Sequence, residues 1–585
     1  MAVKQRAWGQ YETLPELADL ILGFCFRRPT DSLLDPSCGE GMFLRRAARF
    51  QRWLAEDSTA GSRPVLWGVD IDPQAVQKAR QLLEAESLGA QVVAADFIAL
   101  EPGQAPGMPP MFDCIVGNPP YTRSEWLEAD GLSAREAATR ALNPAEGEQT
   151  VRWSKRSGLH GYFFLQGLQF LRPGGRFGFV VSNSWLDVQY GAGIKAFLLA
   201  NFKIIAIVES AVEQWFVNAK VNTCIIIMER SDSAAQRQDH QVRFARLNQP
   251  LRHWLVEQDS RPTAVDGLVA RILPGKSRPG GDLPVRVIPQ KALDPAEKWG
   301  PYLRGPDVFF QTRRDERQVP LGQVASLRRG LTTGANDFFY LTPGRIHEWQ
   351  IDERLTRPLL KSPKEVQRIL VAGSDVSHRV LSLNAHSVDD VSTPIGRYVG
   401  WGESLGLHQL RTCARRPCWY SLLMAGSDAP QVAVPKGIWR RHAVLLLEAG
   451  IEVDQQFYLV QARPEYLPVI AALLTSSWAA LQIELFGRRN FGLGVLWLAA
   501  TDLLGVRLPD PRHIGQDATA QLVEALDKLA AEPLRPLAEQ VAEPARQSLD
   551  TLVFDLLGLT AADRQATVGA AVNLAEARMQ RAASG

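Results

Sequence analysis

The residues best suited to chemistry are Asn118, Pro119, Pro120 and Tyr121, which follow the apolar run FDCIVG at 112–117. Proline has no amide proton to give to a neighbouring strand, so a strand must end at this tetrapeptide. The amide oxygen of Asn118 and the carbonyl oxygen of Pro119 are two adjacent acceptors that can hold both N–H groups of a ring's exocyclic amine. An amine held in this way loses conjugation with its ring, and its lone pair becomes available for attack. Pro120 stiffens the backbone that carries the acceptors, and the Tyr121 ring offers a face for stacking.

Carboxylates and glycines follow two earlier apolar runs. The segment DPSCGEG begins with Asp35 and has glycines at 39 and 41, which let the backbone approach a ligand at a helix N-terminus. It contains G-x-G rather than the G-x-G-x-x-G of dinucleotide folds, and its leading carboxylate suits a positively charged amine better than a pyrophosphate. Asp70 ends the next run, in GVDID, where an acid commonly binds the two hydroxyls of a ribose.

A third run ends in ADF, where Asp96 can accept from an adenine amino group and Phe97 can pack on the adenine ring. An amine, a ribose and an adenine without phosphates describe S-adenosylmethionine. Each feature alone is weak, because a carboxylate at a strand end is more often a cap or a surface charge. Together, at the edge where open α/β sheets bind ligands, they indicate a site for this cofactor.

The elements that must position these residues alternate apolar runs with helical patterns over residues 11–230. This alternation predicts an α/β fold, a Rossmann-like and mostly parallel sheet covered by helices. We expect strands at 32–35, 64–72, 90–97, 112–117, 176–183, 204–210 and 221–230, the last two as a hairpin-like pair, and helices at 42–56, 73–86 and 161–171.

The motifs DPSCGEG, GVDID, ADF and GNPPY, in this order, resemble those of the amino-methylating DNA methyltransferases. The order of these parts along the chain is similar to that of the family's gamma class. In that order the cofactor motifs come first, the catalytic motif next and a large recognition region last. GQYETLPELADLI at 9–21 is similar to the class's N-terminal cofactor motif, with Thr13 toward the methionine part and Leu14 standing before Pro15. The resemblance implies transfer of a methyl group from S-adenosylmethionine to N6 of a flipped-out adenine in double-stranded DNA, in a restriction–modification or related defence system.

The same resemblance implies further site residues. Phe163 falls near the cofactor adenine, and an aromatic residue after the sixth strand sandwiches the flipped base; Phe216 is the candidate and Trp215 its rival. The expected catalytic residues are Asn118, Pro119, Pro120, Tyr121 and Phe216. The expected cofactor-binding residues are Thr13, Asp35, Pro36, Cys38, Gly39, Gly41, Asp70, Ile71, Asp96, Phe97, Asn118 and Phe163.

Four regions are expected: a methyltransferase domain at 1–230, a linker or start of the recognition region at 231–299, a mixed α+β target-recognition domain at 300–511, and a helical tail at 512–585. Formal charge is unevenly distributed among them, since residues 231–511 carry 35 Lys and Arg against 28 Asp and Glu, a net +7, whereas the whole chain is only +2. A polyanion would meet that basic part of the chain, although surface solubility alone explains such a charge equally well.

Paired arginines beside polar turns in this basic part suit contacts with DNA phosphates and base edges. For any one of them, a solvated loop between strands is the more common explanation. The expected DNA-binding residues are Arg328, Arg329, Asn336, Arg415, Arg416, Arg440, Arg441, Arg488 and Arg489.

Other functions stay open at this stage. N4 of cytosine is a conjugated amine like N6 of adenine, so the same tetrapeptide serves a cytosine-directed enzyme. Methyltransferases of ribosomal RNA or of protein glutamine also carry N-P-P-Y, but they lack a long basic region after the catalytic domain. We expect no nuclease activity in this chain, because about 30 residues precede the first strand and no metal-binding carboxylate–lysine cluster is evident; a separate nuclease or defence-system subunit would be a partner.

Bulk composition limits the remaining possibilities. The six cysteines do not form a disulfide framework, and the spacing of Cys413 and Cys418 is not that of a zinc site, so no metal is expected. We find neither a membrane-spanning run nor a signal peptide. The chain is therefore expected in a prokaryotic cytoplasm, associated with the nucleoid.

Overall fold

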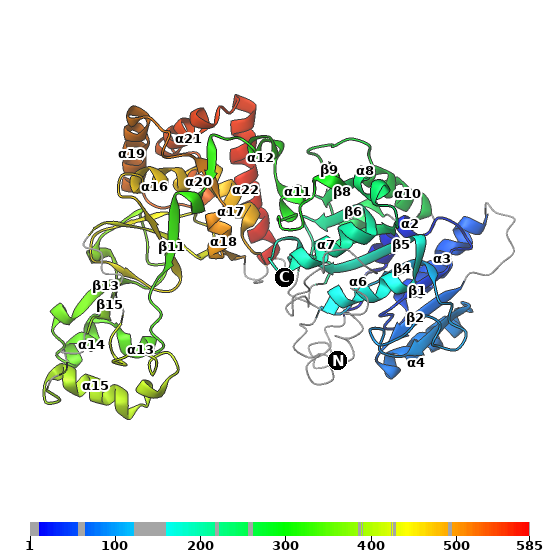
Figure 1. The fold of residues 1–585 in the computed structure, drawn as a ribbon, viewed down its shortest axis with the longest axis horizontal. Coiled ribbons are helices and arrows are strands. Elements are labelled where there is room, and N and C mark those ends of the chain that lie inside the picture. The colour runs from blue at the N-terminus through cyan, green and yellow to red at the C-terminus, as the bar shows by residue number, and fades with distance from the viewer. Residues whose placement is uncertain are drawn as a thin grey trace. The chain divides into compact units, whose positions relative to one another are not determined.

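The computed structural model of the 585-residue chain describes residues 11–56, 65–121, 159–216, 222–255, 261–383, 388, 390–422, 424, 429–489 and 494–583. The chain divides into two compact units (Figure 1). The N-terminal unit comprises Met1–Gly305 with Arg581–Gly585, and the C-terminal unit comprises Pro306–Gln580.

Within the described residues, the N-terminal unit contains a nine-stranded sheet in the order β3-β2-β1-β4-β5-β7-β6-β8-β9. The pairs from β3 to β5 are parallel, whereas β7 runs antiparallel to both β5 and β6. The strands are β1 (Leu33–Asp35), β2 (Leu66–Asp70), β3 (Ala90–Ala94), β4 (Phe112–Gly117), β5 (Leu171–Ser182), β6 (Phe202–Ser210), β7 (Thr223–Arg230), β8 (Gln241–Leu247) and β9 (Val285–Pro289). The expected Rossmann-like sheet and the antiparallel pairing of its last two expected strands are confirmed.

Helices cover this sheet and begin where the sequence favours it. Pro73 starts α4 directly after Asp72, whose side chain caps the helix by accepting from the Gln74 amide. The apolar face of α2 packs on the sheet, with Leu17, Leu20 and Ile21 fully buried. The helices of this unit are α2 (Pro15–Cys25), α3 (Met42–Glu56), α4 (Pro73–Ala85), α6 (Leu159–Phe170), α7 (Gly191–Asn201), α8 (Ala234–Asp239), α9 (Leu251–Trp254), α10 (Arg261–Ile272) and α11 (Gly300–Arg304).

Residues 231–299 differ from the expected linker, because they extend the sheet. Strand β8 pairs parallel with β6, and β9 pairs antiparallel with β8. The Gln290 side chain fastens this extension, since its amide donates to the Phe202 carbonyl at 2.8 Å and accepts from the Ile204 amide at 2.9 Å. The expected boundaries near 230 and 300 therefore shift to Gly305, and the Gly/Pro-rich stretch at 271–284 only joins α10 to β9.

The C-terminal unit combines several small sheets with helices. Its sheets have the orders β10-β22, β11-β20-β16-β18-β14, β12-β15-β13-β19 and β17-β21. The strands are β10 (Gln318–Pro320), β11 (Ala325–Arg329), β12 (Tyr340–Leu341), β13 (Thr356–Leu360), β14 (Leu370–Val371), β15 (His378–Leu381), β16 (Gln431–Pro435), β17 (Gly437–Ile438), β18 (Leu445–Leu447), β19 (Glu452–Val453), β20 (Phe457–Ala462), β21 (Leu496–Trp497) and β22 (Arg507–Pro509).

Helices in the C-terminal unit form a bundle against one of these sheets. They are α12 (Asp307–Thr312), α13 (Asn336–Phe339), α14 (Pro343–Glu348), α15 (Pro394–Ser404), α16 (Leu467–Thr475), α17 (Ser477–Phe486), α18 (Ala500–Leu504), α19 (Gln516–Ala531), α20 (Leu537–Gln540), α21 (Pro544–Leu557) and α22 (Ala561–Ala583). No single described helix is long and apolar enough to cross a membrane; α16 and α17, bent by 71° at their junction, meet that test of length and composition only as a pair.

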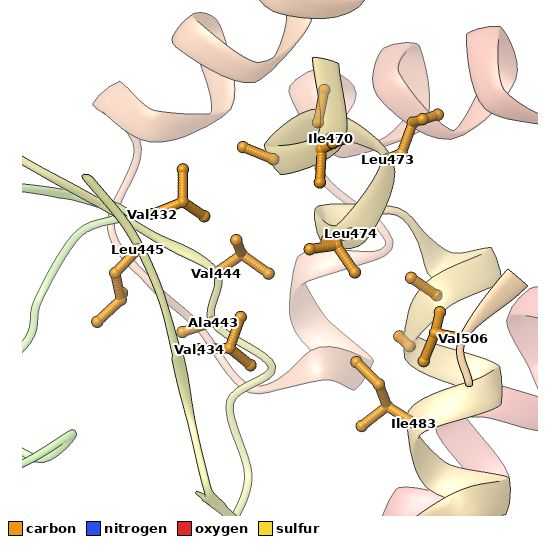
Figure 2. Close-up of a cluster of buried hydrophobic side chains, with 14 of the residues drawn as sticks. Val432, Val434, Ala443, Val444, Leu445, Ile470, Leu473, Leu474, Ile483 and Val506 are labelled. Atoms are coloured by element: carbon orange, nitrogen blue, oxygen red, sulfur yellow. The ribbon is translucent and has the colours of Figure 1, made fainter. Parts of the chain in front are cut away.

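The region expected as a separate helical tail belongs to this unit's main core. One cluster of buried residues joins β16 and β20 to α16, α17, α19, α21 and α22. Figure 2 shows part of it, with labels on Val432, Val434, Ala443, Val444, Leu445, Ile470, Leu473, Leu474, Ile483 and Val506. The helices expected after residue 512 are confirmed. Their apolar faces pack on the sheet and helices that precede them and complete the same core.

A buried ion cluster fixes the last helix to this core. The Glu484 carboxylate, on α17, accepts from Arg578 of α22 at 2.7 Å and lies 2.9 Å from His442 Nε2. Arg489 pairs with the same carboxylate at 3.7 Å. Burial alone would raise the pKa of Glu484, but the His442 hydrogen bond and the Arg578 charge lower it to about 2.

We predict that Glu484→Gln destabilises the C-terminal unit by about 3–5 kcal/mol, because it leaves buried cations without their counter-charge. The depressed folded-state pKa contributes stability that is complete above the ordinary value of 4.5 and is lost as the pH falls toward 2. Calorimetric unfolding should therefore show a difference between wild type and variant that narrows below pH 4.5. The exposed Glu524, in Glu524→Gln, is the matched control; equal losses in both variants would contradict the prediction.

Candidate active site

The carboxyl ends of β1 and β2 are tied together by one side chain. Asp70, the last residue of β2, accepts from the Gly39 amide at 2.8 Å through one carboxylate oxygen and from the Asp72 amide at 2.9 Å through the other. Burial raises the pKa of Asp70, and these two amide bonds partly offset that rise. The loops after the two strands are thus held in one arrangement at the edge of the sheet.

The loop after β1 leaves its backbone open. Gly39 and Gly41 both have positive φ, +52° and +88°, which ordinary side chains rarely adopt. A Cβ built on Gly39 would meet no atom within 4 Å, so the peptide there faces open space. Pro36 and Cys38 are buried beneath this loop, and burial raises the pKa of the Cys38 thiol well above its usual range, which makes it a packing residue rather than a nucleophile.

Asp35, the last residue of β1, is an almost fully buried carboxylate. It accepts from the Ser37 amide at 3.1 Å, and it forms no salt bridge with a lysine or arginine of the described segments. Burial raises the pKa of this carboxyl well above its usual range, and the nearby charge of Asp70 adds to the rise. A cation brought to Asp35 would relieve this cost, so the site favours a positively charged ligand group.

Farther along the edge lie the two aromatic residues that are expected beside the cofactor adenine. The Phe97 and Phe163 rings lie 5.5 Å apart, and both are buried. Asp96 is exposed and uses one carboxylate oxygen to accept from the Ile98 amide at 3.0 Å. Ile71 is half exposed beside Asp70, which leaves its side chain available to a ligand.

Asn118 is held at the end of β4 by its neighbours. Its Nδ2 donates to the Tyr11 carbonyl at 3.0 Å and to Thr13 Oγ1 at 3.3 Å. Its Oδ1 accepts from the Tyr121 hydroxyl at 2.5 Å. Thr13 therefore contacts Asn118 of the N-P-P-Y tetrapeptide even though Leu14 stands before Pro15, and the Asn118 amide is oriented with its oxygen toward Tyr121.

Three aromatic rings meet beside Asn118. Tyr121 stacks on Tyr11 with ring centroids 5.8 Å apart and meets Phe216 edge-on at 5.7 Å. Phe216 also contacts Tyr11 at 6.2 Å, whereas Trp215 donates to Glu213. Of the two candidates after β6, Phe216 is the one beside the tetrapeptide. Sequence reasoning missed Tyr11, although the signal was an aromatic residue two positions before Thr13.

An arginine of α11 joins the end of β6 to the segment that follows β5. Arg304 of α11 donates to both oxygens of Glu209, at 3.0 and 3.3 Å, and to Asp187 at 3.0 Å. Burial would lower the pKa of Arg304, but the two carboxylates raise it. Glu209 is the penultimate residue of β6, seven positions before Phe216, and Asp187 follows η2 (Asn183–Leu186). Sequence reasoning missed Arg304 because it lies 95 residues from Glu209.

The expected DNA-binding residues separate into two groups in the C-terminal unit. Three arginines are used within the fold: Arg416 donates to the Thr332 and Thr333 carbonyls, Arg441 to the Val366 and Pro363 carbonyls, and Arg489 to the Glu484 carbonyl. The other expected side chains bind no carbonyl group of the described residues and are exposed or half-exposed: Arg328, Arg329, Asn336, Arg415, Arg440 and Arg488. Of these, Arg488 pairs with the buried Asp502 at 3.8 Å.

Family comparisons cover most of the chain. The model described as Eco57I restriction-modification methylase matches residues 90–216, and the model of the C-terminal domain of Type II methyltransferase M.Eco57I matches residues 302–542. A third, the RMKL-like methyltransferase domain, matches residues 12–130.

Individual relatives extend these matches over the whole chain. The Type II methyltransferase M.XhoI of Xanthomonas vasicola is 23% identical over 91% of this chain and 93% of its own length. M.PaeR7I of Pseudomonas aeruginosa is 24% identical over 96% of this chain and 94% of its own length. Among solved structures, the Type IIL restriction-modification enzyme MmeI in complex with DNA aligns with a TM-score of 0.58 at 14% identity, over 100% of this chain and 76% of that one, which shows a shared fold.

We predict that Arg304→Met destabilises the N-terminal unit by about 3–5 kcal/mol, because it removes the buried cation that bonds both Glu209 and Asp187. Thermal unfolding measures the loss. Adding Glu209→Gln and Asp187→Asn should recover part of it, since the carboxylate charges that Arg304 balanced are then removed. Arg172→Met, at a half-exposed pair with Asp113, is the control and should cost about 1 kcal/mol or less. Similar losses for Arg304 and Arg172 would contradict the prediction.

Proposed function

We propose that this chain, which belongs by its matches to the DNA methyltransferases of restriction–modification systems, methylates N6 of adenine in duplex DNA with S-adenosylmethionine as donor. The observation that carries the proposal is the position of Asn118-Pro119-Pro120-Tyr121 at the end of β4, the neighbour of β1. The acceptors for a ring amine and the buried carboxylate that favours a cation thus lie at one edge of one sheet.

The residues at this edge fit the proposed cofactor. Asp35 would hold the cationic amine, because the fold gives this buried carboxylate no other cation among the described residues. Asp70 would receive the ribose hydroxyls, because its carboxylate, oriented by the Gly39 and Asp72 amides, ends β2 beside β1. Asp96, Ile71 and the Phe97–Phe163 pair would enclose the adenine. When bound, S-adenosylmethionine supplies a methyl group activated by a sulfonium.

Asn118 and its neighbours would bind the target nucleobase. Tyr11 and Thr13 hold the amide nitrogen of Asn118, which leaves its oxygen to accept one N–H of the target amine. The Pro119 carbonyl would accept the other, so the two acceptors direct the nitrogen lone pair toward the methyl group. The oxygen of Asn118 keeps a second lone pair besides the one that the Tyr121 hydroxyl occupies.

The flipped base would stack on Tyr121, with Phe216 closing the opposite side. Tyr11 occupies part of this space, since its ring lies against the Tyr121 face. No side chain of low pKa is needed as a base, because the amine proton is released after the methyl group has been transferred. Burial raises the pKa of Tyr121 well above its usual range, which keeps its hydroxyl protonated as a donor.

DNA would be read by the C-terminal unit. We assign the contacts to the exposed or half-exposed residues Arg328, Arg329, Asn336, Arg415, Arg440 and Arg488, and not to the three arginines that bind carbonyls of the fold. Cytosine N4 is the second candidate target, because Asn118 and Pro119 would hold its amine in the same way. Cleavage by a separate nuclease and a cytoplasmic location remain predictions.

We predict that Asn118→Ala lowers methyl transfer at least about 100-fold while cofactor and DNA still bind, because the lost oxygen acts on the target amine rather than on binding. Transfer of radiolabelled methyl groups to duplex DNA measures the rate, and calorimetry measures cofactor binding. Asn248→Ala, in a surface loop of the same unit, is the matched control. Near-normal turnover in Asn118→Ala would rule out the assigned role.

We predict N6-methyladenine as the product in DNA from cells that express the protein. Long-read sequencing identifies both the modified base and its sequence context in one measurement. Detection of N4-methylcytosine alone would identify cytosine N4 as the target instead of adenine N6. Absence of any modified base would contradict both targets.

A further inference from the structure

Three aromatic rings crowd one another beside the tetrapeptide. The ring centres of Tyr11 and Tyr121 lie 5.8 Å apart, those of Tyr121 and Phe216 5.7 Å, and those of Tyr11 and Phe216 6.2 Å. Because the three separations are nearly equal, the centres form a triangle, and Tyr11 lies on the same side of Tyr121 as Phe216. That side is the one on which the flipped base would be held between Tyr121 and Phe216.

This arrangement leaves no room for a base. Atoms in contact lie about 3.5 Å apart, so a planar base between two rings needs ring centres about 7 Å apart. Both neighbours of Tyr121 are closer than that, and the Tyr121–Phe216 pair is edge-on, with 67° between the ring planes. A base can therefore stack on Tyr121 only if a neighbouring ring withdraws.

The three rings differ in how firmly the fold holds them. Phe216 is 4% exposed and belongs to the core of the N-terminal unit. The Tyr121 hydroxyl donates to Asn118 at 2.5 Å. The Tyr11 ring is half-buried at the edge of this core, and its hydroxyl forms no hydrogen bond with any described residue. Tyr11 is therefore the ring that the fold holds least firmly.

The main chain of Tyr11, in contrast, is part of the site. Its carbonyl accepts from Asn118 Nδ2 at 3.0 Å, and Thr13 Oγ1 accepts from the same nitrogen at 3.3 Å. Rotation about the Cα–Cβ bond moves the ring without moving the carbonyl. The ring can thus leave Tyr121 while Asn118 keeps the orientation that presents its oxygen to the target amine.

We propose that Tyr11 is a specificity-determining residue that occludes the base site, with its ring covering Tyr121 until a target base displaces it. The inference rests on the proposed function, since it takes Tyr121 as the surface on which the flipped base stacks. An entering base must offset the contacts that the Tyr11 ring makes with Tyr121 and Phe216. The fraction of the protein in which the ring is withdrawn therefore limits the apparent affinity for the base. A nucleotide without a base leaves the ring in place.

The test compares two duplexes that carry the sequence context identified by long-read sequencing, one intact and one with an abasic nucleotide at the target position. Anisotropy of a fluorescent label measures the dissociation constant of each duplex with the full chain, without a methyl donor. We expect Tyr11→Ala to bind the intact duplex about fivefold more tightly and the abasic duplex as wild type does, because only a base has to displace the ring. The ratio of the two constants cancels any general effect of the substitution on folding.

Two further variants accompany the alanine variant. Tyr11→Phe keeps the ring and loses only the hydroxyl, so its ratio of the two constants should equal that of wild type. Tyr11→Leu keeps an apolar side chain against the core but has no flat ring. It should show a gain in the ratio of at least about twofold, and it replaces the alanine variant if that variant does not fold.

An unchanged ratio in Tyr11→Ala and Tyr11→Leu would overturn the occlusion and leave Tyr11 as a structural residue. Weaker binding of the intact duplex alone would overturn it as well, because the Tyr11 ring would then be a surface on which the base stacks. A wild-type chain that transfers no methyl group to DNA would instead refute the proposed function, and the occlusion with it.

Discussion

The hydrogen bond between the Gly39 amide and the Asp70 carboxylate joins the two loops on which the rest of the site depends. Strands β1, β2 and β4 are parallel neighbours, so their last residues meet at one edge whatever the loops between them contain. Topology brings Asp35, Asp70 and Asn118 to that edge, and the bond between the first two loops sets their separation. This hydrogen bond requires the positive φ of Gly39 and Gly41, because the loop must turn the Gly39 amide toward β2.

The aromatic side of the site, at Phe216, is positioned by a buried ion cluster rather than by the order of the strands. Arg304 binds both Glu209, near the end of β6, and Asp187, in the segment that follows β5. Phe216 lies seven residues after Glu209, and its ring contacts Tyr121 and Tyr11. The extension β8–β9 carries the chain to α11, so a segment without any recognisable motif supplies the residue that holds the aromatic side together.

Sequence alone predicted strands β1 to β7 of the N-terminal unit, its Rossmann-like fold and the residues at the ends of the first four strands. These signals are local, because apolar runs and the residues that stop them lie within ten positions of each other. The β8–β9 extension was taken for a linker because its strands are short and separated by a Gly/Pro-rich connection. Tyr11 and Arg304 were missed because their roles arise from contacts across about 100 residues. Among the arginines expected to bind DNA, Arg416, Arg441 and Arg489 look the same in sequence as Arg440, and the structure distinguishes them by the carbonyl groups that they bind.

The position of Arg578 near the end of the sequence also affects the order in which the two units can fold. Domains generally fold as units while the chain is synthesised from its N-terminus. The described strands of the N-terminal sheet are complete by residue 289. Glu484, in contrast, pairs with Arg578, which is synthesised 94 residues later. Until α22 emerges from the ribosome, the C-terminal core holds a buried carboxylate with His442 and Arg489 alone. The core of the C-terminal unit is therefore completed only after the sheet of the N-terminal unit.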